Sequence, residues 1–306
     1  MPDQHILPSW RDGATRSAIL SFFADVDQIP PAERVAVFDN DGTMWAEKPN
    51  YTQLEFLLLQ LAAAVAEDPA IGDRPEFAAV LAGDTPAIHA LGLERVGTAF
   101  LDLFAGITPE AFDGRVASFF ADQVHPVRGV PYRQTRYQPM LELMDELRNH
   151  GFDFYIVSAG GAEFVRVIGE DFYGVKPEGV VGSQIDYEFT RDHGGRAQLV
   201  RTNALVAGGP NEGPMKPPNI QRILGRHPCV AGGNSAGDAE MLEYAKAYDG
   251  PSLALLVNHD DGDREYAYES VAGTFAANEP ITDTAIRLGW TVISMKHDWS
   301  TVFAPS

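Results

Sequence analysis

The sequence predicts an α/β fold built on an open, parallel β-sheet with flanking helices. Short apolar segments alternate with amphipathic helical segments over the first 44 residues and again from residue 137 onward. Three of the apolar segments end in clusters of polar and small residues, DNDGT, SAGG and GNSAGD. Sheets of this kind bind ligands beyond the carboxyl ends of their strands, so we expect the three clusters to meet at one site.

The first predicted strand is VAVF at residues 35–38, a β-branched and aromatic run typical of a buried parallel strand. The segments 183–189 and 198–205 flank the turn-forming sequence RDHGGR and are expected to pair as a hairpin. Further strands are predicted at residues 152–161, 179–185, 198–206, 228–232, 253–257 and 290–294.

The stretch between residues 46 and 136 has helical periodicity and little strand pattern. Apolar residues at helical spacing occur at 51–67, 75–82, 86–105 and 109–122. We therefore predict a helical domain at 46–136, inserted into a core domain formed by residues 1–45 and 137–306. In the core, helices are expected at 137–150, 162–171 and 217–225, the first ending at Gly151.

Composition excludes some classes of partner. The formal net charge of −20 argues against nucleic acid and against an anionic membrane surface as partners. No apolar stretch reaches the ~18 residues of a membrane span, and no signal peptide is recognisable, so a cytoplasmic location is expected. The single cysteine, Cys229, is expected to be a buried thiol. The sequence leaves the oligomeric state open.

Asp39 and Asp41 follow the first strand and, two residues apart, are expected to point to the same side. Two shielded carboxylates repel each other, which raises a pKa, and a divalent cation removes that repulsion. One carboxylate can then attack phosphorus while the other transfers protons. Gly42 permits a sharp turn, and Thr43 is expected to hydrogen-bond the nearby loop. A surface turn would use the same residues, so this motif alone leaves both interpretations open.

Four segments, in order, resemble the signatures of the haloacid dehalogenase (HAD) superfamily. VAVFDNDGT resembles the first, YIVSAGG the second, the lysine in GPMKPPNIQRIL the third and VAGGNSAGDAEML the fourth. They span residues 35–242, and the fourth looks most similar to the phosphoserine-phosphatase-like branch. The resemblance implies a HAD-like fold, in which a Rossmann-like parallel sheet core carries a helical cap domain after its first strand.

The resemblance also implies a role for each matching residue. Asp39 would be the nucleophile, Asp41 the general acid and base, and Ser158 and Lys216 the groups that hold the phosphoryl oxygens. Mg²⁺ would be bound by Asp39, Asp41 and acids of the fourth motif. The implied function is a phosphomonoesterase that acts on a small phosphorylated metabolite.

One position departs from the family pattern. The fourth motif usually begins with aspartate, whereas this chain has Asn234, a neutral and weaker ligand for magnesium. Asp238 is expected to compensate, either directly or through water. Because a neutral ligand at position 234 would weaken metal binding, a catalytically weak phosphate-binding or regulatory protein is an alternative interpretation. A dehalogenase or phosphonatase of the same fold is a further alternative, although Asp41 speaks against a dehalogenase and the segment 51–136 has no lysine for a phosphonatase.

Specificity is expected to come from residues at the edges of the insertion. Glu47 is a candidate to meet an ammonium group, and Arg133 is a candidate to bind a carboxylate or second phosphate, with Arg128 and Arg136 nearby. Hinge packing and surface charge explain the same residues equally well. His259, with Asp260 and Asp261, follows a predicted strand, and a solvated loop is expected there in preference to a catalytic or metal-binding role. The substrate itself is not predicted.

Overall fold

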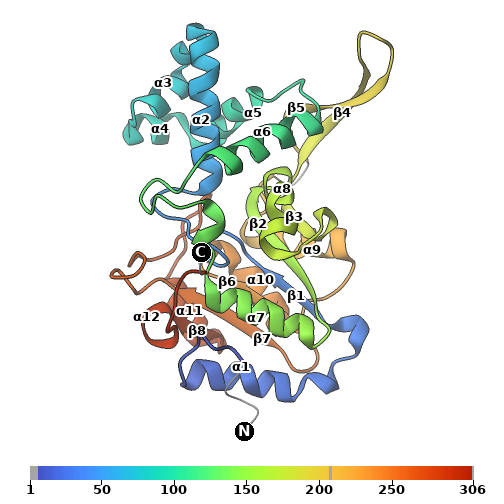
Figure 1. Cartoon of the computed structure of the whole chain (residues 1–306), viewed down its shortest axis with the longest axis vertical. Helices are drawn as coiled ribbons and strands as arrows, with labels where there is room; N and C mark the ends of the chain where they lie inside the picture. The colour runs from blue at the N-terminus through green and yellow to red at the C-terminus, as the bar shows by residue number, and fades with distance from the viewer. Residues whose placement is uncertain (1–5, 207–208, 305–306) are drawn as a thin grey trace.

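The computed structural model of the protein describes residues 6–206 and 209–304. Its centre is a parallel sheet with the strand order β3-β2-β1-β6-β7-β8 (Figure 1). The predicted α/β class is confirmed, and each strand lies within or beside its predicted segment. The strands are β1 Val35–Phe38, β2 Asp153–Gly161, β3 Val180–Ser183, β6 Val230–Gly233, β7 Leu253–Asn258 and β8 Thr291–Ser294.

The strand order contains a switch point between β1 and β6. From β1 the chain moves outward through β2 and β3, and it then returns to the other side of β1 to add β6, β7 and β8. The two strands are in register, with Ala36 beside Val230 and Phe38 beside Gly232. The carboxyl ends of β1 and β6 therefore border the crevice in which sheets of this type bind ligands.

Helices cover both faces of the sheet, because alternate residues of each strand point to opposite sides. Ala36 and Phe38 share a core cluster with residues of α1, α7 and α8. Val35 and Val37 share another with residues of α9, α10 and α11. These helices are α1 Ala14–Ala24, α7 Gln138–Asn149, α8 Ala162–Tyr173, α9 Lys216–Leu224, α10 Ala239–Lys246 and α11 Ile281–Leu288, and the short α12 Met295–Asp298 follows β8.

The predicted insertion at residues 46–136 is helical, and its helices α2 to α6 gather at one end of the molecule (Figure 1). One predicted helix, 86–105, is instead divided into α4 and α5, because Gly92 between them has a φ of +89° that favours glycine. The helices are α2 Thr52–Glu67, α3 Pro75–Leu81, α4 Thr85–Leu91, α5 Leu93–Asp102 and α6 Pro109–Asp122.

The insertion combines a small core of its own with an aromatic contact to the main core. Leu61, Phe77 and Phe100 are central members of the small cluster. Phe56 in α2 packs against Phe164 in α8, with 5.5 Å between ring centres. The insertion is therefore packed directly against the helix that follows β2.

The predicted hairpin is confirmed as the antiparallel pair β4 Ile185–Arg191 and β5 Ala197–Leu205, beside the insertion in Figure 1. Buried Arg201 in β5 donates from Nε to Glu163 Oε2 in α8 at 3.0 Å, and its backbone N–H donates to Ile107 at 2.9 Å. The hairpin therefore joins α8 to the insertion. Cys229 is buried, as predicted. Among the described residues, no helix combines the length and apolar character that crossing a bilayer requires.

Candidate active site

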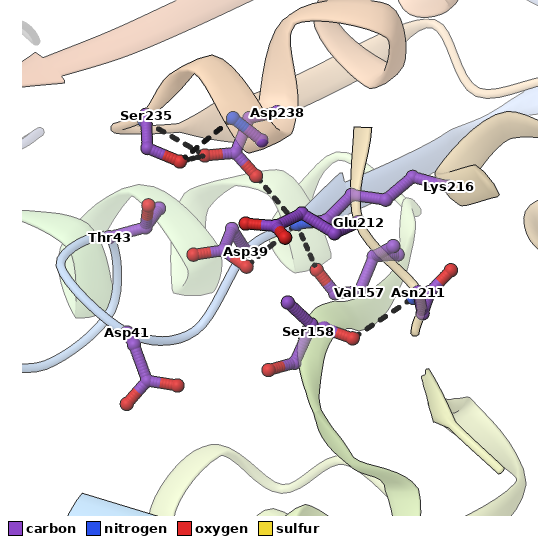
Figure 2. Close-up of polar contacts among 12 residues, drawn as sticks. Asp39, Asp41, Thr43, Val157, Ser158, Asn211, Glu212, Lys216, Ser235 and Asp238 are labelled. Atoms are coloured by element: carbon purple, nitrogen blue, oxygen red, sulfur yellow. Dashed lines mark hydrogen bonds and ion pairs between the residues drawn. The ribbon is translucent and has the colours of Figure 1, made fainter. Parts of the chain in front are cut away.

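Lys216 connects the three strand ends that the sequence predicts to converge. Its side chain is 1% exposed, and its Nζ donates to Asp39 Oδ1 at 2.8 Å, Asp238 Oδ1 at 2.5 Å and the Val157 carbonyl at 2.9 Å (Figure 2). Asp39 follows β1, Val157 belongs to β2, and Asp238 follows β6. Asp39 and Lys216, which are 177 residues apart in sequence, thus meet at this ammonium group.

A cavity of about 300 Å³ opens beside this lysine. It brings together the predicted residues of all four motifs: Asp39, Asp41, Ser158, Lys216, Asn234 and Asp238. Glu47 also lines the cavity, as do Tyr51, Gln53, Leu54 and Leu57 at the start of the insertion and Val271, Gly273 and Thr274 from the segment after β7. The pocket therefore has walls from the sheet edge, from α2 and from a loop.

Asp39 and Lys216 form a buried ion pair with opposing influences on their protonation. Burial raises the pKa of Asp39, as does the neighbouring Asp238 carboxylate, whereas the Lys216 ammonium opposes that rise. Burial alone would lower the pKa of Lys216, but the carboxylates of Asp238 and Asp39 outweigh it and raise the pKa above its ordinary value. Lys216 is therefore a fixed positive charge beside the predicted nucleophile.

Asp41 lies on the turn after Asp39, within the same cavity (Figure 2). Burial raises the pKa of its carboxyl group to about 7, even though a hydrogen bond from the Trp45 indole lowers it. The Glu47 carboxylate contributes to the rise by repulsion. Near neutral pH the group can therefore exist in both protonation states, as a group that gives and then takes a proton requires.

The turn that carries Asp41 packs closely on the fourth motif. Gly42 has a φ of +73°, and a Cβ atom at this position would lie only 2.0 Å from Asn234 Nδ2. Thr43 Oγ1 donates to Asn234 Oδ1 at 3.3 Å, which confirms the expected contact between Thr43 and a nearby loop. Asn234 Nδ2 in turn donates to Ser270 Oγ at 3.2 Å. Glycine is therefore required at position 42 for steric reasons as well as for its φ.

Asp238 is predicted to bind the metal directly or through water, and in the structure it holds Lys216 and the loop after β6. Its Oδ1 accepts from Lys216, and its Oδ2 accepts from the backbone N–H groups of Asn234 and Ser235, both at 3.0 Å (Figure 2). Both carboxylate oxygens are thus engaged within the protein. Asp238 orients the lysine and closes the loop after β6, and Asn234 is the fourth-motif side chain whose oxygen faces the catalytic turn.

Ser158 lies at the end of β2 and is almost fully buried. Its Oγ accepts from the Gly160 amide at 3.0 Å, and the neighbouring Gly161 amide donates to Gln53 Oε1 of α2 at 2.8 Å. Asn211 Nδ2 donates to the Ser158 carbonyl at 3.0 Å. The second motif is therefore held from both sides, by the insertion and by the segment that leads to Lys216.

Of the two predicted substrate residues, the structure places one at the cavity. Glu47 is 5% exposed there, and burial raises its pKa, although the electrostatic influence of His259 and Lys48 opposes that rise. Arg133 does not line the cavity, and its guanidinium pairs with Asp171 in α8 at 3.1 Å. The structure therefore places Arg133 away from the cavity, in a solvent-exposed ion pair with α8, and does not support the predicted substrate contact.

The expectation of a solvated loop at His259 is wrong. The imidazole is 3% exposed, and its Nε2 donates to the Gly42 carbonyl at 2.8 Å. Its Nδ1 lies 3.3 Å from Glu265 Oε2, and the ring stacks on Tyr268. The histidine thus supports the turn between Asp39 and Trp45 through its hydrogen bond to the Gly42 carbonyl. Its position after a predicted strand was the only signal in the sequence.

Further residues of the site carry no motif by which sequence could identify them. Glu212 accepts from the Gly273 amide at 2.6 Å and from the Thr274 hydroxyl, which anchors the loop after β7 across the cavity. Gln53 approaches the second motif only because α2 packs beside β2. These contacts join segments about 60 and 108 residues apart, and no local pattern marks them.

The oxygen donors of the pocket are suited to a divalent cation. Within residues 6–206 and 209–304, no three His, Cys, Asp or Glu side chains converge as a ready-made metal cluster. A metal would therefore use mixed donors, namely a carboxylate oxygen of Asp39, the Asp41 backbone carbonyl and Asn234 Oδ1. Mg²⁺ accepts such hard oxygens together with water. Burial and the Asp238 carboxylate raise the pKa of Asp39, so a cation bound beside Asp39 would favour its charged form.

A parallel sheet with a switch point, at which two aspartates, a serine and a lysine converge, defines an α/β protein with a Rossmann-like core. The chain belongs to the haloacid dehalogenase-like hydrolase family, whose family model matches residues 36–243. The match covers all four motifs, so the predicted family is confirmed. No curated protein matched the chain in the comparison.

Two solved structures have similar architecture. One is a protein with unknown function from Bordetella pertussis Tohama I, with a TM-score of 0.52 and 17% identity over 85% of this chain and 98% of that chain. The other is a conserved, functionally unknown protein from Anaerococcus prevotii DSM 20548, with a TM-score of 0.52 and 17% identity over 90% of each chain. A substrate-bound phosphoserine phosphatase complex also matches, with a TM-score of 0.37 and 14% identity over 83% and 97% of the two chains. The first two structures support the fold, and the predicted branch continues to rest on the sequence motifs.

Proposed function

We propose that this chain is a Mg²⁺-dependent phosphohydrolase that acts on a small phosphomonoester through an aspartyl-phosphate intermediate. The observation that supports it best is the buried Lys216 ammonium, 2.8 Å from Asp39 in a cavity that Asp41 and Ser158 also line. Phosphoryl transfer requires a positioned nucleophile, a fixed cation and a proton donor. Asp39, Lys216 and Asp41, the residues proposed for these roles, all line this one pocket.

In the proposed reaction, Asp39 attacks phosphorus and forms a covalent phosphoryl intermediate. The Lys216 ammonium balances charge that spreads over the phosphoryl oxygens. The Ser158 hydroxyl donates a hydrogen bond to the same oxygens. These groups fix the phosphoryl group while the bond to the leaving alcohol breaks.

Asp41 is the proposed proton carrier. In its protonated form it gives a proton to the leaving alkoxide, and the resulting carboxylate then takes a proton from the water that hydrolyses the intermediate. Mg²⁺, held by Asp39, the Asp41 carbonyl and Asn234, would supply positive charge to the phosphoryl oxygens. The helical insertion is proposed to act as a cap that shields this chemistry from bulk water.

The test is hydrolysis of p-nitrophenyl phosphate by the full-length protein with Mg²⁺ and with EDTA. We expect turnover that depends on Mg²⁺ and is abolished by Asp39→Asn, while Asp27→Asn, a change of a fully exposed aspartate, leaves it intact. Equal turnover by Asp39→Asn would remove Asp39 from the nucleophile role. No turnover across a broad panel of phosphate esters would favour a phosphate-binding or regulatory protein.

A further inference from the structure

We infer that the substrates are monophosphates whose alcohol part carries no second anionic group and is neutral or positively charged. This inference rests on the phosphomonoesterase activity proposed above. It follows from the charges that line the cavity and from the positions of the basic side chains around it.

Lys216 is the only lysine or arginine among the described residues that line the cavity. Its ammonium has three N–H donors, and they are directed to Asp39, Asp238 and the Val157 carbonyl. Because this ammonium lies beside Asp39, it is positioned to interact with the transferred phosphoryl group and not with a second anionic group of the substrate. The residues outside the described part of the chain, positions 1–5, 207–208 and 305–306, include no lysine or arginine.

The other basic groups near the insertion are each held by a protein partner, and the partner of Lys48 is Glu47, a residue of the cavity wall. The Lys48 ammonium lies 3.9 Å from the Glu47 carboxylate and 4.5 Å from the Tyr268 ring centre, and Lys48 does not line the cavity. Arg128 lies 3.5 Å from the Phe303 ring centre. Arg136 donates to the Phe172 carbonyl at 2.5 Å. A carboxylate or second phosphate is normally bound by a free guanidinium or ammonium, and no described residue that lines this pocket offers either.

The wall that would face the leaving alcohol is acidic and apolar. Glu47 and Glu212 line it and are both largely buried. Leu54 and Leu57 of α2, and Tyr51 just before it, provide apolar surface. A second anion would therefore be desolvated among charges of its own sign, whereas an amine or an alkyl group would not.

A matched pair of substrates tests the inference, because O-phosphoethanolamine and O-phosphoserine differ by a single carboxylate. With full-length protein and Mg²⁺, we expect kcat/KM for O-phosphoethanolamine to exceed that for O-phosphoserine by at least about tenfold. We expect the same order for propyl phosphate over phosphoglycolate, a pair without an amine. Equal or better turnover of the carboxylated partners would overturn the inference, whereas no turnover of any ester would overturn the proposed activity along with it.

A variant tests whether charge, and not the shape of the pocket, excludes substrates with a second anionic group. Val271 lines the cavity and is 66% exposed, so its replacement should not disturb the core. We expect Val271→Arg to raise kcat/KM for O-phosphoserine several-fold relative to O-phosphoethanolamine, and Val271→Gln, a neutral control of similar reach, to leave the ratio unchanged. An unchanged ratio in Val271→Arg would contradict exclusion by charge.

Discussion

The indole Nε1 of Trp45 donates a 2.9 Å hydrogen bond to Oδ1 of Asp41, the proposed proton carrier. The indole is fully buried and packs against Phe120 in α6 and Phe172 in α8, with ring centres 6.0 and 5.9 Å apart. The same side chain therefore fixes one oxygen of Asp41 and contacts both the helical insertion and the core.

Trp45→Phe should remove the hydrogen bond while it keeps an aromatic ring in the core. We expect kcat for an alkyl phosphate to fall about tenfold, because Asp41 would lose its orientation for proton transfer. The loss for p-nitrophenyl phosphate should be smaller, since p-nitrophenolate leaves without a proton. As a control, Phe172→Leu loosens the packing and keeps the N–H donor, so it should affect both substrates alike. Equal losses in Trp45→Phe would speak against a positioning role.

Lys216→Met should be strongly destabilising, because it leaves Asp39 and Asp238 buried without a counter-charge. Removing one partner of a buried ion pair typically costs about 3–5 kcal/mol. The measurement is urea denaturation near neutral pH. The double variant Lys216→Met/Asp238→Asn should recover part of the loss, since it removes one of the two uncompensated charges. A single variant as stable as the wild-type protein would show that the carboxylates do not depend on this lysine.

Asp41→Asn should stabilise the metal-free protein at high pH. The pKa of Asp41 is raised in the folded state from 3.8 to about 7 by burial. Protonation of Asp41 therefore stabilises the folded state. This contribution to the free energy of unfolding is fully present below pH 3.8 and is lost as the pH rises through about 7. In EDTA at about pH 8 we expect the variant to be about 1–3 kcal/mol more stable, with no difference near pH 4. Asp27→Asn is the exposed control. Destabilisation of Asp41→Asn at pH 8 would refute this account.

Asn234→Asp should strengthen Mg²⁺ binding. A carboxylate is a stronger magnesium ligand than an amide oxygen, so we expect the apparent dissociation constant to fall about tenfold, measured by titration calorimetry and by activity. The change also breaks the bond from Asn234 Nδ2 to Ser270, and Ser270→Ala measures that effect alone. Unchanged affinity in Asn234→Asp would mean that this side chain does not reach the metal.

Much of the site could be predicted from local sequence. The β-branched run at 35–38 specifies a buried strand, and the turn residues after it place Asp39 and Asp41 at its carboxyl end. The order of the motifs also anticipates the meeting of Ser158 and Lys216, because parallel strands end at a common edge. Arg133 and His259 were not predicted correctly, because an arginine at a domain edge and a histidine after a strand have no local pattern that reveals their partners.

The sequence by itself determined the α/β class, the family and the strand ends that carry the chemistry, because backbone periodicity and turn chemistry are local properties. Only the tertiary structure decided that Asp238 accepts a hydrogen bond from Lys216 and that His259 supports the turn at Gly42. It also decided that Glu47 faces the cavity, whereas Arg133 pairs with Asp171. Those outcomes depend on packing between distant segments, which sets where a side chain points and which charges it meets.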